Sequence, residues 1–133
     1  MLVVESGGTR YGIEADYIHE IITNPAVTKA PVQPDYLIGL NNYKSQVIPV
    51  LSLDKLCGSE EKDSVACIVL EYQDGLAGLA VSGLGGMVDH ELVSEIDGSQ
   101  MESCGYIRIK KVLEQDGLIL VLDLEEMFQQ LCV

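Results

Sequence analysis

Basic residues and large aromatic residues are both scarce in this 133-residue chain. Lysine and arginine number 8 against 21 acidic residues, which gives a formal net charge of −13 at pH 7, and phenylalanine and tryptophan supply one residue between them. A surface of that charge repels phosphate backbones and anionic lipid. The composition therefore argues against a protein that binds nucleic acid.

Long apolar runs and closely paired cysteines are missing as well. No segment reaches the length of a membrane span, and the N-terminal MLVVESGG has no basic region followed by a long apolar segment. The cysteines are widely spaced, without a C-x-x-C pair, which favours buried reduced thiols over a zinc site. We expect a cytoplasmic protein with no direct membrane insertion, no metal and no other cofactor.

Groups that could carry out catalysis are also few. His19 and His90 lie in unlike contexts, and no G-x-S-x-G, H-E-x-x-H or P-loop pattern occurs. Carboxylate pairs such as Glu125–Glu126 are unavoidable among so many acids, and a solvated surface accounts for them. The sequence predicts no catalytic residue, although a small acidic enzyme or ligand-binding barrel stays open as an alternative.

The chain instead contains two copies of one apolar pattern. The stretch that begins at Leu2 aligns without a gap with the stretch that begins at Ile68, so that Gly12 matches Gly78. A later stretch, VIPVLSLDKLC, aligns in the same way with LILVLDLEEMF, so that Val50 matches Val121. A repeat of this kind predicts two similar structural units.

Each copy predicts a β-hairpin followed, later in the chain, by a strand that runs into a short helix. The middle of the first copy contains Pro25, Pro31 and Pro34 and reads as irregular, as does the polar segment 91–106 in the second. The predicted hairpin strands are Leu2–Glu5 with Arg10–Ile13 and Cys67–Tyr72 with Leu76–Val81; the predicted strand–helix pairs are Val47–Leu53 with Asp54–Cys57 and Leu118–Leu122 with Asp123–Leu131.

These elements predict an all-β chain of two small barrels in tandem. Because a unit of about sixty residues is marginal alone, the two barrels should share a hydrophobic core. The expected division is a first barrel at 1–57, a polar connection at 58–65, and a second barrel with the C-terminal helix at 66–133.

The residues of the first copy resemble the CheW-like domain family, and the similarity continues through nearly all of the chain. YGIEADYIHEI and GLNNYKSQVIPVLSLDKL follow the family's pattern of Y-G-I, an E-I pair, then G-x-x-N-L-R-G and a proline before the strand. The matching positions are Tyr11, Gly12, Ile13, Ile18, Glu20, Ile21, Pro34, Gly39, Asn42, Pro49, Val50 and Leu53.

The resemblance implies a single domain at 1–133, built as two five-stranded SH3-like barrels that short helices close, with no enzymatic activity. It also implies an adaptor of bacterial chemotaxis, cytoplasmic and recruited to membrane receptor arrays. Its implied partners are the regulatory domain of the histidine kinase CheA and the cytoplasmic hairpin tip of a chemoreceptor. Carried over to this chain, the partner-binding positions are Ile18, Glu20, Gly39, Asn42, Tyr43 and Lys44.

The segment after Asn42, which reads as a turn, differs from the family pattern at three neighbouring positions. Tyr43, Lys44 and Ser45 replace a leucine, an arginine and a glycine. Lysine keeps the charge without the planar fork of arginine, tyrosine adds a polar tip, and serine is expected to limit the turn to φ values that a β-carbon tolerates. A diverged binding module of another signalling system therefore stays open, as does Ile18 as a simple core residue. The turn has no counterpart that we can align in the second copy.

Overall fold

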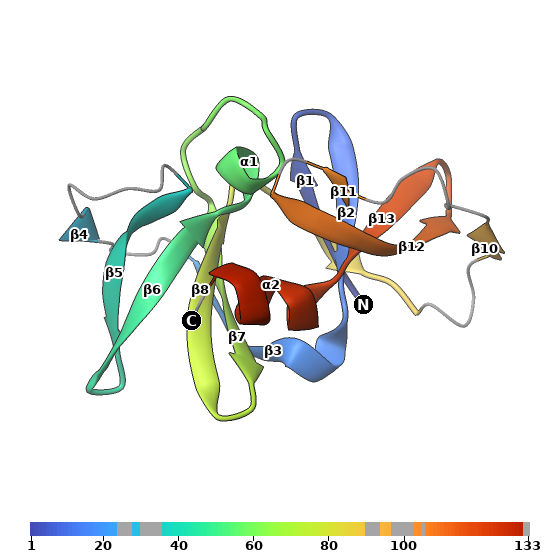
Figure 1. Ribbon diagram of the computed structural model, residues 1–133. Helices are drawn as coiled ribbons and strands as arrows, with labels where there is room; N and C mark the ends of the chain where they lie inside the picture. Colours follow the sequence, from blue (N-terminus) through green and yellow to red (C-terminus); the bar gives the residue numbers. More distant parts are fainter. Residues whose placement is uncertain (24–27, 30–35, 90–93, 97–102, 105, 132–133) are drawn as a thin grey trace.

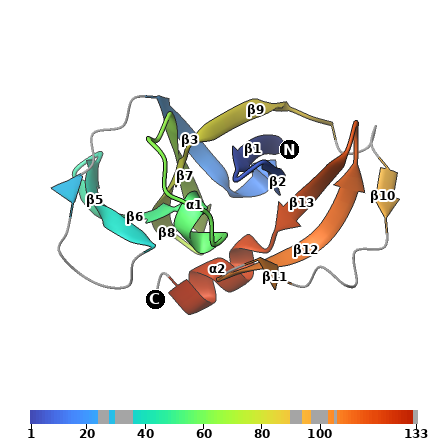
Figure 2. The same ribbon diagram turned by 90° about the horizontal axis from the view of Figure 1, so that it is seen from above.

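Two β-sheets lie side by side in the computed structural model, with helix α2 at their junction (Figure 1 and Figure 2). The structure describes residues 1–23, 28–29, 36–89, 94–96, 103–104 and 106–131. His90, the three prolines of the first irregular segment and most of segment 91–106 lie outside the described residues.

The first sheet combines strands from both ends of the chain. Its order is β10-β12-β13-β2-β1-β9, and β11 pairs with β12 beside this path. The strands are β1 (Leu2–Ser6), β2 (Thr9–Ile13), β9 (Gly83–Met87), β10 (Ser94–Ile96), β11 (Ser103–Cys104), β12 (Ile107–Glu114) and β13 (Leu118–Leu122). The short strands β10 and β11 lie in the segment 91–106 that we expected to be a loop.

The second sheet holds the middle of the chain, in the order β3-β7-β8-β6-β5-β4. Its strands are β3 (Ile18–Thr23), β4 (Thr28–Lys29), β5 (Leu37–Tyr43), β6 (Gln46–Ser52), β7 (Ala66–Tyr72) and β8 (Gly75–Val81). The other elements are a 3-10 helix η1 (Ala15–Tyr17) and the helices α1 (Leu53–Leu56) and α2 (Leu124–Leu131).

The two repeats exchange their hairpins. The β1–β2 hairpin of the first repeat pairs in parallel with β13 of the second, where Gly12 lies opposite Val121. The β7–β8 hairpin of the second repeat pairs in the same way with β6 of the first, where Gly78 lies opposite Val50. These are the positions that the repeat alignment matched, so the exchange is symmetric.

This exchange groups the strands differently from the expected division of the chain. Barrels at 1–57 and 66–133 would each use strands of one half, whereas each sheet takes strands from both sides of segment 58–65. The physical reason is that the repeat matches the two hairpins to each other and the two closing strands to each other, so the sequence alone leaves open which hairpin pairs with which strand. The prediction of an all-β chain with few helices is confirmed. Closure into five-stranded SH3-like barrels stays a prediction, because the pairing of the described strands gives each sheet two ends.

The pairing also supplies a counterpart for the turn after β5. Hairpin β5–β6 lies next to β8 in one sheet, and hairpin β12–β13 occupies the same place next to β2 in the other. The turns themselves differ in length and sequence: Lys44–Ser45 joins β5 to β6, and 115–117 joins β12 to β13. That difference explains why no alignment linked the two turns.

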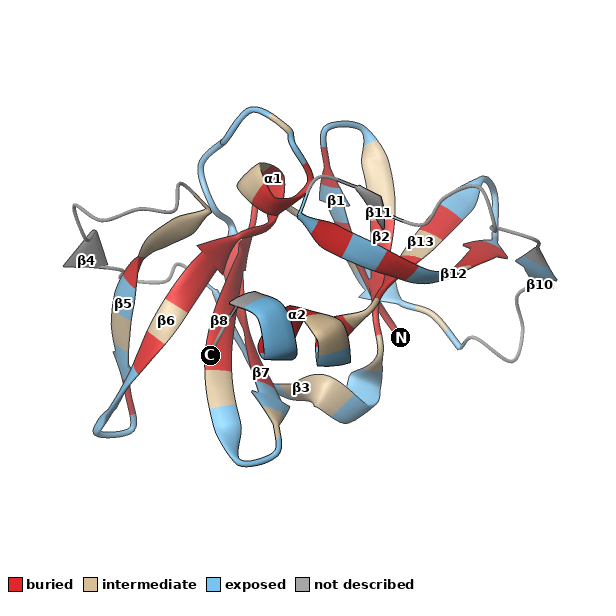
Figure 3. Ribbon diagram, viewed as in Figure 1, coloured by how far each residue is buried: buried red, intermediate tan, exposed pale blue. Residues whose placement is uncertain are grey.

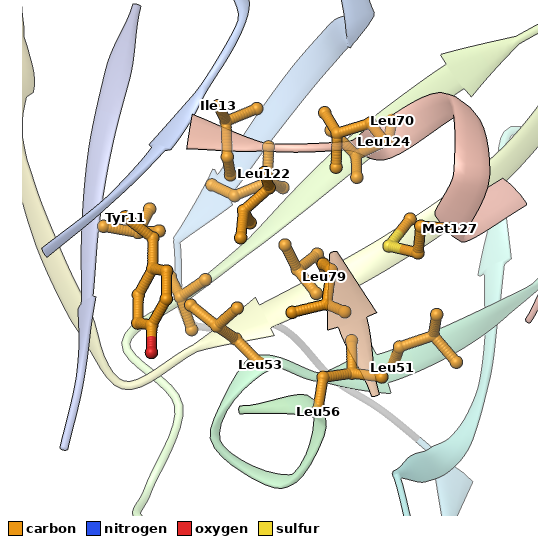
Figure 4. Close-up of a cluster of buried hydrophobic side chains, with 14 of the residues drawn as sticks. Tyr11, Ile13, Leu51, Leu53, Leu56, Leu70, Leu79, Leu122, Leu124 and Met127 are labelled. Atoms are coloured by element: carbon orange, nitrogen blue, oxygen red, sulfur yellow. The ribbon is translucent and has the colours of Figure 1, made fainter. Parts of the chain in front are cut away.

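One main core serves both sheets. Figure 4 shows Tyr11 and Ile13 of β2 near Leu79 of β8, together with side chains from both helices. The cluster also takes Leu51 at the end of β6, and Figure 3 shows that the buried stretches of the strands lie toward the middle of the molecule. A single hydrophobic cluster therefore fixes the two sheets relative to each other, since separating them would expose its apolar surface to water.

Helix α2 is attached to this core through one apolar face. Leu124, Met127 and Phe128 are all buried, at helical spacing, and belong to the main cluster. The polar positions Glu125 and Gln129 form hydrogen bonds with Tyr72 at the surface.

Candidate functional site

Side chains from β3 and from the β5–β6 hairpin meet across a part of the sheet where their strands are not paired. Strand β3 is at one end of the six-stranded order and β5 is next to the other end. Even so, the Tyr43 hydroxyl donates a hydrogen bond of 2.5 Å to Oε1 of Glu20. Lys44 Nζ lies 3.7 Å from the same Oε1. We call His19, Glu20, Tyr43 and Lys44 the Glu20 cluster.

The members of the Glu20 cluster differ in exposure. Tyr43 is only 6% exposed and packs with Ile48 and Val69 in a small apolar cluster. The side chains of Glu20 and Lys44 are 45% and 71% exposed. Tyr43 therefore serves as a buried support, while Glu20 and Lys44 present a carboxylate and an ammonium group to solvent.

The hydrogen bond also sets the ionisation of the Glu20 cluster. It lowers the pKa of Glu20 below its ordinary value, and the nearby charge of Lys44 acts in the same direction. The same bond raises the pKa of Tyr43, because the hydroxyl must keep its proton to donate it. At neutral pH, Glu20 is an anion and Tyr43 keeps its proton.

His19 belongs to the same cluster, although the sequence predicted no binding role for it. Its ring meets the Tyr43 ring edge to face, at a centroid distance of 5.9 Å and an interplanar angle of 82°. Its Nδ1 lies 3.8 Å from Oε2 of Glu71 on β7. The Tyr43 contact joins β3 to β5, which are not neighbours in the sheet order, so strand alternation gave no signal for it.

The turn at Lys44 and Ser45 is a tight two-residue turn with φ of 49° and 68°. Both residues are in the left-handed region, which matches the twist of a β-hairpin and usually favours glycine or asparagine. The expectation that Ser45 restricts the turn to ordinary φ values is wrong, because serine adopts the positive φ here. The β7–β8 turn does the same with Gln73 and Asp74.

The remaining predicted positions lie outside the Glu20 cluster. Ile18 is half-buried and packs against the main core. Gly39 is buried in β5, paired with Val50 of β6 and with β4. Asn42 is exposed on β5 beside Tyr43, and successive side chains of a strand point to opposite faces. The structure thus brings together three of the six predicted residues: Glu20, Tyr43 and Lys44.

The outer face of the β5–β6 hairpin is apolar. Leu40 lies opposite Pro49 and Asn42 opposite Val47 in the register of the two strands. Leu40 is 44% exposed and Val47 is 63% exposed. The hairpin therefore presents exposed apolar side chains, and strand alternation puts them on the face opposite Tyr43.

Exposed apolar side chains also occur at repeat-related positions on the other sheet. Ile21 of β3 corresponds to Met87 of β9, and Val47 of β6 corresponds to Leu118 of β13; all four are exposed. Since β3 pairs with β7 as β9 pairs with β1, these residues occupy equivalent places in the two sheets. The two repeats thus carry related surfaces.

The structure contains a few shallow depressions as well. A groove of about 570 Å³ lies at the β1–β2 and β12–β13 turns, where Glu5, Arg10 and Asp116 are among its lining residues. Among the described residues, no group of three or more His, Cys, Asp or Glu side chains is placed to hold a metal ion. No helix within those residues combines the length and the apolar character needed to span a membrane.

Comparison with known proteins gives the family. The model of the CheW-like domain matches residues 1–132. The chemotaxis protein CheV3 of Helicobacter pylori is 25% identical over 131 residues, which cover 91% of this chain and 42% of that protein, so the chain spans less than half of this relative's length. The crystal structure of the scaffolding protein TtCheW from Thermoanaerobacter tengcongensis has the same fold, with a TM-score of 0.76, 20% identity, and coverage of 92% of this chain and 86% of that one. The chain belongs to the CheW-like domain family.

Proposed function

We propose that this protein is a non-enzymatic adaptor of bacterial chemotaxis that couples chemoreceptors to the histidine kinase CheA through protein–protein contacts. The family and the chemotaxis relative support the adaptor role. The coupling of receptor to kinase rests on the site geometry and on the partners that the family implies.

The Glu20 cluster is the observation that carries the proposal. It presents an ionised carboxylate and an exposed ammonium group 3.7 Å apart, on a strand and a turn that a packed tyrosine joins. Fixed charged groups at a surface favour selective binding of a partner with complementary groups over chemistry. We assign this cluster to the receptor's helical hairpin tip, whose polar side chains and backbone groups would meet both charges.

We propose that the kinase's regulatory domain binds the exposed apolar side chains of the β5–β6 hairpin. The family resemblance implies that this domain has the same fold, and a domain of the same repeats would carry apolar residues at the positions of Val47 and Leu118. The buried centre of a specific interface is usually more apolar than its rim, which suits the exposed Leu40 and Val47.

The departures at Tyr43, Lys44 and Ser45 favour one second candidate, a module of the same fold that serves a different signalling system. The two candidates differ in partner, so binding separates them. Isothermal titration of the whole protein against a receptor hairpin and against the kinase regulatory domain should give saturable binding of both. Loss of both interactions would contradict the chemotaxis role and favour the second candidate.

A further inference from the structure

Two donors from adjacent residues converge on one oxygen of Glu20. The Tyr43 hydroxyl donates to Oε1 over 2.5 Å, and Lys44 Nζ stands 3.7 Å from that atom. The first contact is a short directional hydrogen bond, and the second is an ion pair beyond ordinary hydrogen-bond distance. Tyr43 therefore supplies a directional hydrogen bond, and Lys44 supplies a positive charge.

An arginine at position 44 would supply both the directional hydrogen bond and the positive charge from a single side chain. Its planar fork can donate two parallel hydrogen bonds to a carboxylate, while a lysine ammonium acts as a compact point charge on a flexible stem. The family pattern has leucine and arginine where this chain has Tyr43 and Lys44, and a leucine at 43 has no donor to offer. The two departures thus compensate each other chemically.

We infer that Tyr43 is a positioning residue whose hydrogen bond, together with the charge of Lys44, replaces the directional and charged contact to Glu20 that an arginine at position 44 would make alone. Its role is to hold the Glu20 carboxylate in one orientation at the surface, where a partner's hydrogen-bond donor meets an acceptor already in place. The consequence for binding depends on the proposed function; the positioning itself does not.

The surroundings of Tyr43 restrict its ring. The residue is 6% exposed, packs with Ile48 and Val69, and meets the His19 ring edge to face. A ring held on several sides loses little further rotamer freedom when its hydroxyl binds, so the hydrogen bond costs less entropy than one between two mobile surface side chains. Lys44, at 71% side-chain exposure, has no comparable restriction.

The test uses three variants of the whole protein, Tyr43→Phe, Tyr43→Leu and the double variant Tyr43→Leu/Lys44→Arg. The first readout is the pKa of the Glu20 carboxyl from an NMR titration, which requires no partner. The Tyr43→Phe variant should move that pKa upward toward its ordinary value of 4.5, and so should Tyr43→Leu. The double variant should bring it back down, since the arginine fork replaces the lost donor.

The Tyr72→Phe variant is a matched control, because the Tyr72 hydroxyl also donates to a glutamate, Glu125, over 3.0 Å. This variant should leave the Glu20 pKa unchanged. An unchanged Glu20 pKa in Tyr43→Phe, or no recovery in the double variant, would overturn the inference. A purely structural role for Tyr43 would change the melting temperature without this pattern of loss and recovery.

Binding of a receptor hairpin is the second readout. Tyr43→Phe should weaken it by about tenfold, the effect of one hydrogen bond, with recovery in the double variant. If the pKa pattern holds and the wild-type protein does not bind the hairpin, the positioning role stands and the proposed function fails. If the wild-type protein binds and the pKa pattern is absent, the proposed function stands and the positioning role fails.

Discussion

Ser52 and Asp123 perform the same task at the starts of the two helices. The Ser52 hydroxyl oxygen accepts a hydrogen bond from the backbone N–H of Lys55, and Asp123 Oδ1 accepts one from the N–H of Glu126. The two residues match in the repeat alignment, so the repeat preserves the cap as well as the strands. Each cap satisfies an N–H group that the helix itself leaves without a partner.

Removing either cap should destabilise the protein. Asp123→Ala should lower the free energy of unfolding by about 1 kcal/mol, while Asp123→Ser, which keeps an acceptor, should lose much less. Urea denaturation of both variants provides the measurement. Equal stability of Asp123→Ala and wild type would show that the cap contributes nothing.

Asp54 should be a far more sensitive position. Its buried carboxylate accepts hydrogen bonds from the hydroxyls of Ser6 and Ser82 and from the N–H of Lys62. These bonds tie α1 to β1, to the β8–β9 connection and to segment 58–65. Asp54→Ala leaves three donors without this acceptor and should cost about 2–4 kcal/mol. Asp54→Asn keeps one acceptor oxygen and should cost less in the same chemical denaturation series. A loss below that of the Asp123→Ala cap variant would contradict this account.

Gly78 should not tolerate a methyl group. A β-carbon there would lie 2.7 Å from Cys67 Sγ and 3.3 Å from Val50 Cγ2, both in buried strands. Gly78→Ala should therefore cost about 1–3 kcal/mol, the typical effect of overpacking a core. Gly86→Ala is the control, because a β-carbon at Gly86 meets nothing within 4 Å. Thermal melts that show equal losses for the two variants would exclude the packing explanation.

The hairpin exchange predicts how fragments of the chain behave. A fragment of residues 1–58 contains the β1–β2 hairpin without β13 and β9, and lacks β7 and β8, which lie between β3 and β6. It should not fold alone, whereas a mixture with a fragment of residues 59–133 should regain a cooperative melt by circular dichroism. A cooperative melt of fragment 1–58 by itself would contradict the pairing.

The sequence predicted which residues are equivalent but not which of them pair. Matching Gly12 with Gly78 and Val50 with Val121 was enough to place both hairpins and both closing strands. Strand pairing was not predictable, since a repeat makes pairing within a copy and pairing between copies equally compatible with the same apolar pattern. The positive φ at Ser45 was missed because the twist of the hairpin overrides the intrinsic preference of serine.

The candidate site could be predicted only in part, because its contacts depend on which strands lie near each other. Glu20 and Lys44 followed from the family pattern, and the structure brings them together. The Tyr43–Glu20 hydrogen bond joins β5 to β3, which are separated by three strands in the sheet order, a proximity that only the three-dimensional arrangement supplies. The packing of His19 on Tyr43 depends on the same arrangement.

Binding of a receptor hairpin by the Lys44→Glu variant tests the central claim most directly. Lys44 is the most exposed charged group of the Glu20 cluster, and reversing its charge places two carboxylates together. Lys62→Glu is the matched control, since the Lys62 side chain is exposed and only its backbone N–H contacts Asp54. Titration calorimetry should show affinity for the hairpin at least about tenfold weaker in Lys44→Glu, with the melting temperature nearly unchanged, and unaltered binding in Lys62→Glu. Equal affinity of Lys44→Glu and wild type, or an equal loss in both variants, would contradict a recognition role for the Glu20 cluster.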